Sequence, residues 1–215
     1  MNEADIRKIA ALFPGQWDTH YVAAKLRTDP LYSALENEIR ESDLPLLDIG
    51  CGLGLLALFL RAKGIVVPIH GVDYDVRKVN TANQAANKAS TQGLTFSHHD
   101  ARTGLPEHQG NVSILDILQF FTPAEQETLL SLAASRVAPG GKLVIRSGLH
   151  DDSVRFKITV LGDLLAKVTF WMKAGPTHYP TSDDFQRILK PFGQVKISPL
   201  WGGTPFNNHL IVLTR

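Results

Sequence analysis

The pattern of hydrophobic and polar positions divides the chain at about residue 44. Before that point, apolar residues at helical spacing predict one helix over residues 6–13, which Pro14-Gly15 ends, and a second helical stretch over residues 21–35. From Leu44 onward, short β-type runs alternate with stretches long enough for helices. This alternation predicts parallel strands joined by helical crossovers, which is a doubly wound α/β sheet with helices on both faces.

Residues 194–215 change the pattern again, because they predict two strands around a "GGTP" loop and hence an antiparallel pair. The chain shows no repeat and no Gly/Ser/Pro-rich linker. Its 215 residues, 44% of them hydrophobic, suffice for one sizeable core. We therefore predict a single domain made of an N-terminal helical appendage (1–43), a core (44–148), a variable lid segment (149–179), and a C-terminal helix with an antiparallel hairpin (180–215).

Composition and charge narrow the class of protein. The 22 basic and 21 acidic residues give a net charge of +1 with no block of like charge, so no surface for a nucleic acid is expected. The single cysteine, Cys51, forms no internal disulfide and favours a reducing compartment. No secretory signal and no apolar run long enough to span a bilayer are visible. These features predict a cytoplasmic protein without a membrane span.

The stretch "LLDIGCGLGLLALFL", residues 46–60, places three glycines between two hydrophobic runs. Glycines between a strand and a helix let the backbone approach a ligand and aim the helix amides at it, which indicates a nucleotide-like ligand. Dinucleotide sites use Gly-x-Gly-x-x-Gly, whereas here Gly54 is followed by Leu55. Asp48, inside the strand, needs a hydrogen bond or a cation if it is buried. A sulfonium or an ammonium group therefore fits this site better than a pyrophosphate.

The segment "LLDIGCGLG" resembles the cofactor motif of class I S-adenosylmethionine-dependent methyltransferases, and further landmarks extend the resemblance over residues 44–148. The resemblance implies the Rossmann-like methyltransferase fold, a mostly parallel seven-stranded sheet with an antiparallel C-terminal strand. It also implies S-adenosylmethionine as the cofactor. Its methionyl amino group would lie near Asp48, its methionine and ribose moieties along Gly50, Cys51 and Gly52, and Gly54 would begin the helix.

Later landmarks supply the other cofactor residues. Asp73 in "HGVDYD" ends the next predicted strand, where a carboxylate can accept both ribose hydroxyls, as acids also do in NAD enzymes. The resemblance places Tyr74 against the adenine, although an ordinary strand-end aromatic explains it equally well. In "SHHDAR" it assigns Asp100 to the adenine amine and the Ala101 backbone to the ring. It places Asp116, in "LDILQFF", among the cofactor residues at the mouth of the site, beside Gln119.

The N-terminal segment offers one more cofactor contact. Trp17, Tyr21 and Lys25 are four residues apart and share one helical face. By the resemblance, Tyr21, Lys25 or Arg27 reaches the methionine carboxylate. A solvated helix face is the competing interpretation.

Methyl transfer to a hydroxyl group requires alignment and the removal of a proton. The candidate bases are His150 and His178, and for each a structural or exposed role is the alternative. We interpret Arg146 as a solvated charge at a strand end rather than a pocket residue. Adjacent His98 and His99 point to opposite faces of a strand, and the acidic pairs lack ligand spacing, so no metal site is expected.

The apolar stretch within residues 149–179 predicts an amphipathic helix, whose residues include Phe156, Leu161, Leu164, Leu165, Phe170, Trp171 and Met172. Such a lid favours a small hydrophobic acceptor, which is an aromatic, lipid-like, polyketide or carrier-bound molecule methylated on oxygen or carbon. No "NPPY" or "DPPY" motif is present, which argues against base or glutamine methylation. An NAD(P)-dependent oxidoreductase and a non-catalytic S-adenosylmethionine-binding module are the two alternatives.

Overall fold

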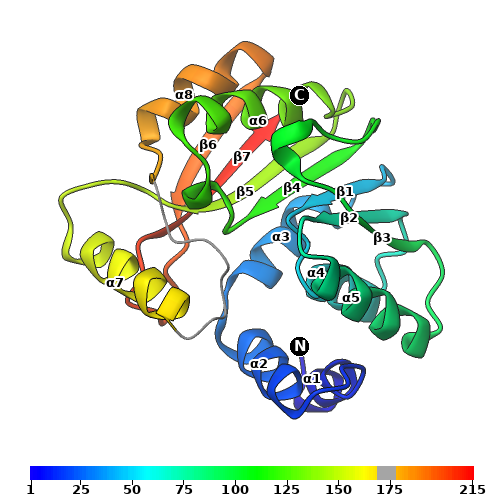
Figure 1. Cartoon of the computed structure of the whole chain (residues 1–215). Helices are drawn as coiled ribbons and strands as arrows, with labels where there is room; N and C mark the ends of the chain where they lie inside the picture. The colour runs from blue at the N-terminus through cyan, green and yellow to red at the C-terminus, as the bar shows by residue number, and fades with distance from the viewer. Residues whose placement is uncertain (169–177) are drawn as a thin grey trace.

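The computed structural model describes the backbone of residues 1–168 and 178–215, and in this part of the chain seven strands form one sheet. The strand order is β3-β2-β1-β4-β5-β7-β6 (Figure 1). The strands are β1 Leu46–Ile49, β2 Ile69–Asp73, β3 Leu94–His98, β4 Asn111–Leu115, β5 Lys142–Gly148, β6 Gln194–Pro199 and β7 Asn208–Thr214. The helices are α1 Glu3–Ala10, α2 Gln16–Thr28, α3 Leu31–Ile39, α4 Leu55–Ala62, α5 Val76–Ala89, α6 Pro123–Ser135, α7 Val154–Val168 and α8 Ser182–Leu189.

The strand directions confirm the predicted fold class. Strands β1 to β5 run parallel, and β7 pairs antiparallel with both β5 and β6. The chain builds outward from β1 in one direction and from β4 in the other, so the order reverses between β1 and β4. In open α/β sheets this reversal leaves a crevice at the carboxyl ends of the strands, which is where ligands bind.

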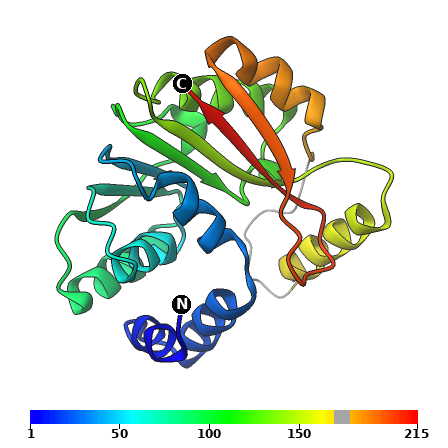
Figure 2. The same cartoon turned by 180° about the vertical axis from the view of Figure 1, so that it is seen from behind.

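Helices cover both faces of the sheet (Figures 1 and 2). On one face, α3, α4 and α5 bury their apolar sides against the sheet, with α1 and α2 packed outside α4. On the other face, α6 and α8 pack together over the β1, β4, β5 and β7 side chains. The N-terminal helices therefore share one hydrophobic core with the sheet.

The second predicted helical stretch, residues 21–35, is wrong as a single helix. Helix α2 ends at Thr28 and α3 begins at Leu31. Asp29 has an extended backbone with φ −90° and ψ 115° because the ring of Pro30 disfavours helical geometry in the residue before it. The break turns the chain at Asp29.

The helix expected within residues 149–179 is present as α7. Its first half exposes apolar side chains, because Val154 and Leu161 are both more than half exposed. Other residues of the predicted helix lie outside the described side chains, namely Leu164, Leu165, Phe170, Trp171 and Met172. At the next helix, Thr181 caps α8 in a reciprocal hydrogen-bond pair with Asp184.

The glycine that begins α4 provides a test of the packing. Gly54 has φ +72°, and a Cβ placed on it would lie 2.7 Å from the Phe96 ring and 3.0 Å from the Ala82 methyl group. We expect Gly54→Ala to lower the free energy of unfolding by about 1–2 kcal/mol for the left-handed backbone and by about 1–3 kcal/mol more for overpacking. Urea unfolding measures this loss.

The matched control is Gly64→Ala, because Gly64 has φ +79° and no atom lies within 4 Å of the position that a Cβ would take there. This variant should show only the backbone part of the loss. Equal losses for the two variants would contradict the packing role assigned to Gly54.

Candidate functional site

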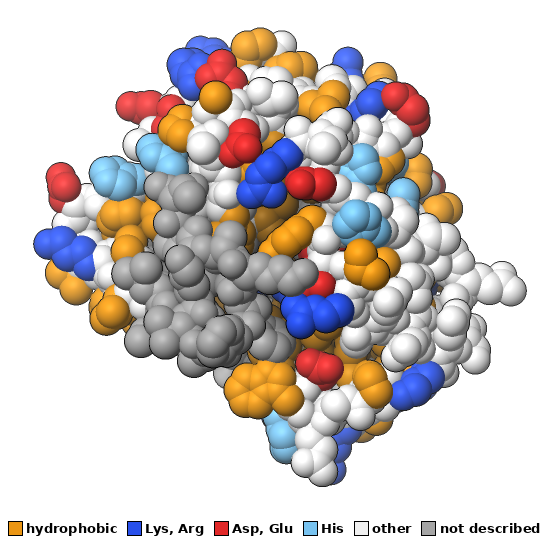
Figure 3. Space-filling model, in the orientation of Figure 1, with side chains coloured by type: hydrophobic (Ala, Val, Ile, Leu, Met, Phe, Trp, Pro, Cys, Tyr) orange, Lys and Arg blue, Asp and Glu red, His pale blue; other side chains and the backbone are white. Residues whose placement is uncertain are grey.

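A cavity of about 800 Å³ opens at the reversal point of the sheet. Its walls come from the carboxyl ends of β1, β2, β4 and β5, from α2 and α3, and from the described part of α7. Figure 3 shows hydrophobic side chains within a hollow of this face, with acidic and basic side chains at its rim. The volume lies within the range of roughly 300–1,000 Å³ typical of small-molecule sites.

The glycine loop after β1 forms the floor of the cavity. Gly50 and Gly52 line it with φ +76° and +55°, and nothing lies within 4 Å of the position of a Cβ on Gly52. The Gly50 and Cys51 amides donate to the Val72 carbonyl at 2.8 and 3.0 Å, which ties the loop to β2. Gly52 therefore presents bare backbone to a ligand, as predicted for this loop.

Gly54 has a different position from the other two glycines. It is the N-cap residue of α4, as expected, but its Cα faces Phe96 and Ala82 and it does not line the cavity. The third glycine thus allows close packing between α4 and α5, and the structure does not bring it to the candidate cofactor site.

Asp48 is a buried carboxylate at the cavity floor. Its Oδ1 accepts a hydrogen bond from the Ser113 hydroxyl at 2.7 Å. Burial raises its pKa from 3.8 to about 7, against the lowering effect of Ser113 and with a further raising effect from Asp73. Within the described residues no cation contributes to this pKa. A cationic ligand group would therefore be bound strongly here.

Asp73 ends β2 beside the glycine loop. Its Oδ2 accepts from the Gly52 amide at 2.9 Å and its Oδ1 accepts from the Asp75 amide at 2.8 Å. Each carboxylate oxygen keeps a lone pair for a ligand hydroxyl. The same carboxylate therefore shapes the loop and lines the cavity.

The other predicted cofactor residues of the central strands also line the cavity. Tyr74 is 43% exposed, and Asp100 and Ala101 follow the end of β3, where Asp100 accepts from the Arg102 amide at 3.0 Å. Cys51 lines the cavity as well, and burial raises the pKa of its thiol well above the usual value. Burial thus favours the protonated thiol over the nucleophilic thiolate.

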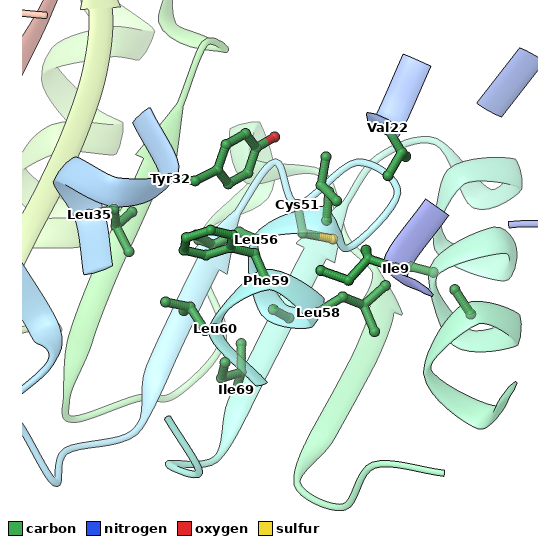
Figure 4. Close-up of a cluster of buried hydrophobic side chains, with 14 of the residues drawn as sticks. Ile9, Val22, Tyr32, Leu35, Cys51, Leu56, Leu58, Phe59, Leu60 and Ile69 are labelled. Atoms are coloured by element: carbon green, nitrogen blue, oxygen red, sulfur yellow. The ribbon is translucent and has the colours of Figure 1, made fainter. Parts of the chain in front are cut away.

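Helices α2 and α3 form the opposite wall because their apolar faces are held in the core. Val22, Tyr32 and Leu35 point toward α4, and the rings of Tyr32 and Phe59 lie 5.4 Å apart (Figure 4). This packing brings Tyr21 and Lys25 of α2 to the cavity, and their contact with the cofactor stays a prediction. Arg27, the third candidate, points elsewhere and pairs with Glu3.

Arg146 is the main correction to the sequence interpretation. Its side chain is only 3% exposed, and it lines the cavity instead of lying in solvent. Its Nε and Nη2 donate to the two oxygens of Asp116, and its Nη1 donates to Asp29 at 2.5 Å. Burial alone would lower the pKa of Arg146, but Asp116 and Asp29 outweigh it and raise the pKa.

Lys25 joins the same group of charges. Its Nζ lies 3.2 Å from Asp29 and 3.9 Å from Asp116. Burial lowers its pKa, but Tyr21, Asp116 and Asp29 outweigh burial, so the net shift is upward. Lys25, Asp29, Asp116 and Arg146, which we call the ion cluster, form one wall of the cavity. The sequence gives one sign that these four residues meet, because Pro30 breaks the helix at Asp29 and turns the chain there.

The two candidate bases do not line the cavity. His150 is exposed, and its ring contacts the Phe156 ring edge-on at 4.8 Å. His178 is held by its backbone, which donates to the Gln119 carbonyl and accepts from the Gln126 side chain. Their role as bases stays a prediction that this placement does not favour.

Neither a metal centre nor a membrane span is found among the described residues. Their side chains include no group of three or more His, Cys, Asp or Glu arranged to hold a metal ion. In the same part of the chain, no helix is both long enough and apolar enough to cross a bilayer.

Comparison with known sequences supports a methyltransferase domain. Residues 46–141 match the family model described as a methyltransferase domain. The chain is also similar to the ribosomal protein L11 methyltransferases of Burkholderia vietnamiensis and Burkholderia orbicola, with 29% and 31% identity over 99 residues. Each alignment covers 46% of this chain and 30% of the relative, so the chain matches less than a third of the length of these relatives.

Solved structures share the fold over nearly the whole chain. The pyocyanin biosynthetic protein PhzM is 18% identical with a TM-score of 0.68, covering 98% of this chain and 62% of its own. Magnesium protoporphyrin IX methyltransferase from Synechocystis PCC 6803, solved with bound S-adenosylhomocysteine, is 18% identical with a TM-score of 0.65, covering 99% and 93%. Residues 46–141 are therefore identified as a methyltransferase domain, and the chain as a whole has the fold of these solved structures.

Proposed function

We propose that the protein transfers the methyl group of S-adenosylmethionine to a small hydrophobic or aromatic molecule, on oxygen or carbon. The observation that carries the proposal is Asp48, a buried carboxylate at the glycine loop with a raised pKa, to which no cation of the described residues contributes. The cofactor's α-ammonium group supplies the missing positive charge. An NAD pyrophosphate would instead bring negative charge to this carboxylate.

The residues around Asp48 fit the rest of the cofactor. Asp73 would accept hydrogen bonds from the ribose hydroxyls, and the bare backbone at Gly52 leaves room for the sugar to approach. Tyr74 and Asp100 would hold the adenine, together with the Ala101 backbone. When bound, S-adenosylmethionine supplies an activated methyl group and its own leaving group, so the protein's task is to align the acceptor and exclude water.

Tyr21 and Lys25 would hold the cofactor's carboxylate from the side of α2. Both side chains line the cavity, and the raised pKa of Lys25 keeps its amine charged. This assignment gives the N-terminal helices a role in closing the cofactor site.

The remaining wall of the cavity supports a small, mostly apolar acceptor. It is built from aromatic and aliphatic side chains with a few hydroxyl and amide groups, namely Phe120, Phe121, Tyr179, Leu200, Phe206, Thr159, Thr204 and Asn208. An aromatic, polyketide, lipid-like or carrier-bound molecule fits such a wall. The ribosomal protein L11 methyltransferases align over fewer than half of this chain's residues and do not define its acceptor.

Titration calorimetry with S-adenosylmethionine, S-adenosylhomocysteine and NAD tests the proposal. We expect the first two to bind and NAD to show no heat of binding. Asp48→Asn should reduce the affinity for S-adenosylhomocysteine by about tenfold or more, because a hydrogen bond to a charged group contributes about 1.5–3 kcal/mol. Glu107→Gln, a surface control, should bind as the unsubstituted protein does. Binding of NAD alone would overturn the assignment.

The raised pKa of Asp48 also predicts a pH-dependent stability of the ligand-free protein. The folded carboxyl has a pKa of about 7 against an ordinary value of 3.8, so the folded state binds more protons than the unfolded state between these limits. The free energy of unfolding should therefore fall from pH 4 to pH 7 because of this group, by at most about 4 kcal/mol.

Asp48→Asn removes this titration. In urea unfolding without ligand, the variant should be more stable than the unsubstituted protein at pH 8 and nearly equal to it at pH 4. A difference that does not change with pH would contradict the assigned pKa.

A further inference from the structure

The ion cluster is internally neutral. It contains two cations, Lys25 and Arg146, and two carboxylates, Asp29 and Asp116. The guanidinium of Arg146 directs its Nε, Nη1 and Nη2 at these two carboxylates. Tyr32 lines the same wall, and burial raises its pKa well above the usual value, so its hydroxyl group adds no charge.

Within the ion cluster, Asp116 is the member with the most exposed side chain. Its side chain is 36% exposed, compared with 11% for Asp29 and 3% for Arg146. A carboxylate that accepts two hydrogen bonds from one guanidinium keeps lone pairs for further donors. Asp116 therefore offers hydrogen-bond acceptors to the cavity, whereas Arg146 directs its donors at carboxylates.

Asp116 has an unusual backbone conformation. Asp116 has φ +57°, one of two left-handed non-glycine residues in the described chain. Such a conformation costs about 1–2 kcal/mol and persists where the surroundings impose it. Here the Asp116 amide donates to the Arg146 carbonyl at 3.1 Å, and the Asp116 carbonyl accepts from Gln119 at 3.1 Å. These two hydrogen bonds hold the left-handed backbone of Asp116 just after the end of β4, at the point where the strand order reverses.

The cavity that Asp116 lines also has aromatic side chains in its walls. Phe120 and Phe121 follow Asp116 on the same loop and line the cavity, together with Tyr179 and Phe206. A flat ring packs well against such side chains, with gains of about 0.5–1.5 kcal/mol per aromatic pair. The cavity thus combines aromatic surface with the Asp116 carboxylate, and each cation of the ion cluster already has a carboxylate partner.

We infer that this wall recognises an uncharged hydroxyarene, whose O–H group donates a hydrogen bond to Asp116, and that Arg146 is the positioning residue that holds Asp116 in place. The inference rests on the proposed function and narrows its acceptor class. An anionic acceptor is disfavoured because it would meet the Asp116 carboxylate. Arg146 directs its donors at Asp29 and Asp116, and Lys25 is assigned to the carboxylate of the cofactor. A hydroxyarene can take the methyl group on its oxygen or on an activated ring carbon.

Calorimetry on the protein saturated with S-adenosylhomocysteine tests this recognition with three matched probes. The probes are 2-naphthol, 2-methoxynaphthalene and 2-naphthoate, which share one ring system and differ in the hydrogen-bonding group. We expect 2-naphthol to bind about tenfold more tightly than either of the others, since its hydroxyl group alone can donate to Asp116.

Asp116→Asn keeps the shape of the side chain, and asparagine tolerates the left-handed backbone. It should reduce the affinity for 2-naphthol about tenfold, because the carboxylate acceptor is lost. It should raise the affinity for 2-naphthoate, because Arg146 loses one carboxylate partner. Arg146→Lys should lower the preference for 2-naphthol in part, since lysine keeps the charge without the two-pronged geometry. All affinities are compared at saturating S-adenosylhomocysteine, and urea unfolding of Asp116→Asn separates a loss of acceptor recognition from misfolding.

Glu107→Gln is the matched control. Glu107 forms the same kind of pair with Arg136, through two hydrogen bonds of 2.8 Å, outside the cavity. Its probe preference should equal that of the unsubstituted protein. Equal binding of the three probes, no binding of any, or an unchanged preference in Asp116→Asn would overturn the inference while S-adenosylhomocysteine still binds. Failure of S-adenosylhomocysteine itself to bind would overturn the proposed function.

Discussion

The hydrogen bonds that Asp73 accepts hold the candidate site in shape. One oxygen binds the Gly52 amide and the other binds the Asp75 amide, so a single carboxylate joins the glycine loop to the turn that begins α5. Gly52 is free to take its left-handed conformation because it has no side chain. Without this link, the loop after β1 would lose its attachment at the point where the backbone is barest. The floor of the cavity depends on this carboxylate.

Buried charges at the two ends of the cavity are balanced in different ways. At the floor, Asp48 has a hydroxyl partner and a raised pKa, so a cationic ligand is favoured there. At the opposite wall, the ion cluster balances its own charges through Arg146. A buried charge that lacks a partner is costly, whereas a balanced cluster can face an apolar cavity. Under the proposed function, this contrast assigns the floor of the cavity to the ammonium group of the cofactor and the opposite wall to an uncharged acceptor.

Some elements of the fold were predictable from the sequence and others were not. The alternation of strands and helices and the terminal hairpin predicted the fold class, since hydrophobic periodicity reports which face of each element is buried. The helical stretch predicted over residues 21–35 is divided between two helices, because Pro30 disfavours helical geometry at Asp29. Arg146 was misplaced because a charged residue in a strand is usually solvated, and its two partners come from segments 30 and 117 residues away.

The sequence by itself determined the glycine loop, the acid within β1 and the acid at the end of β2, because these depend on local spacing along one strand and one turn. Only the tertiary structure decided that Gly52 faces the cavity while Gly54 faces Phe96, and that neither His150 nor His178 lines the cavity. It alone brought Lys25, Asp29, Asp116 and Arg146 together. Periodicity fixes the face of an element, but ion pairs between distant segments depend on how those elements pack.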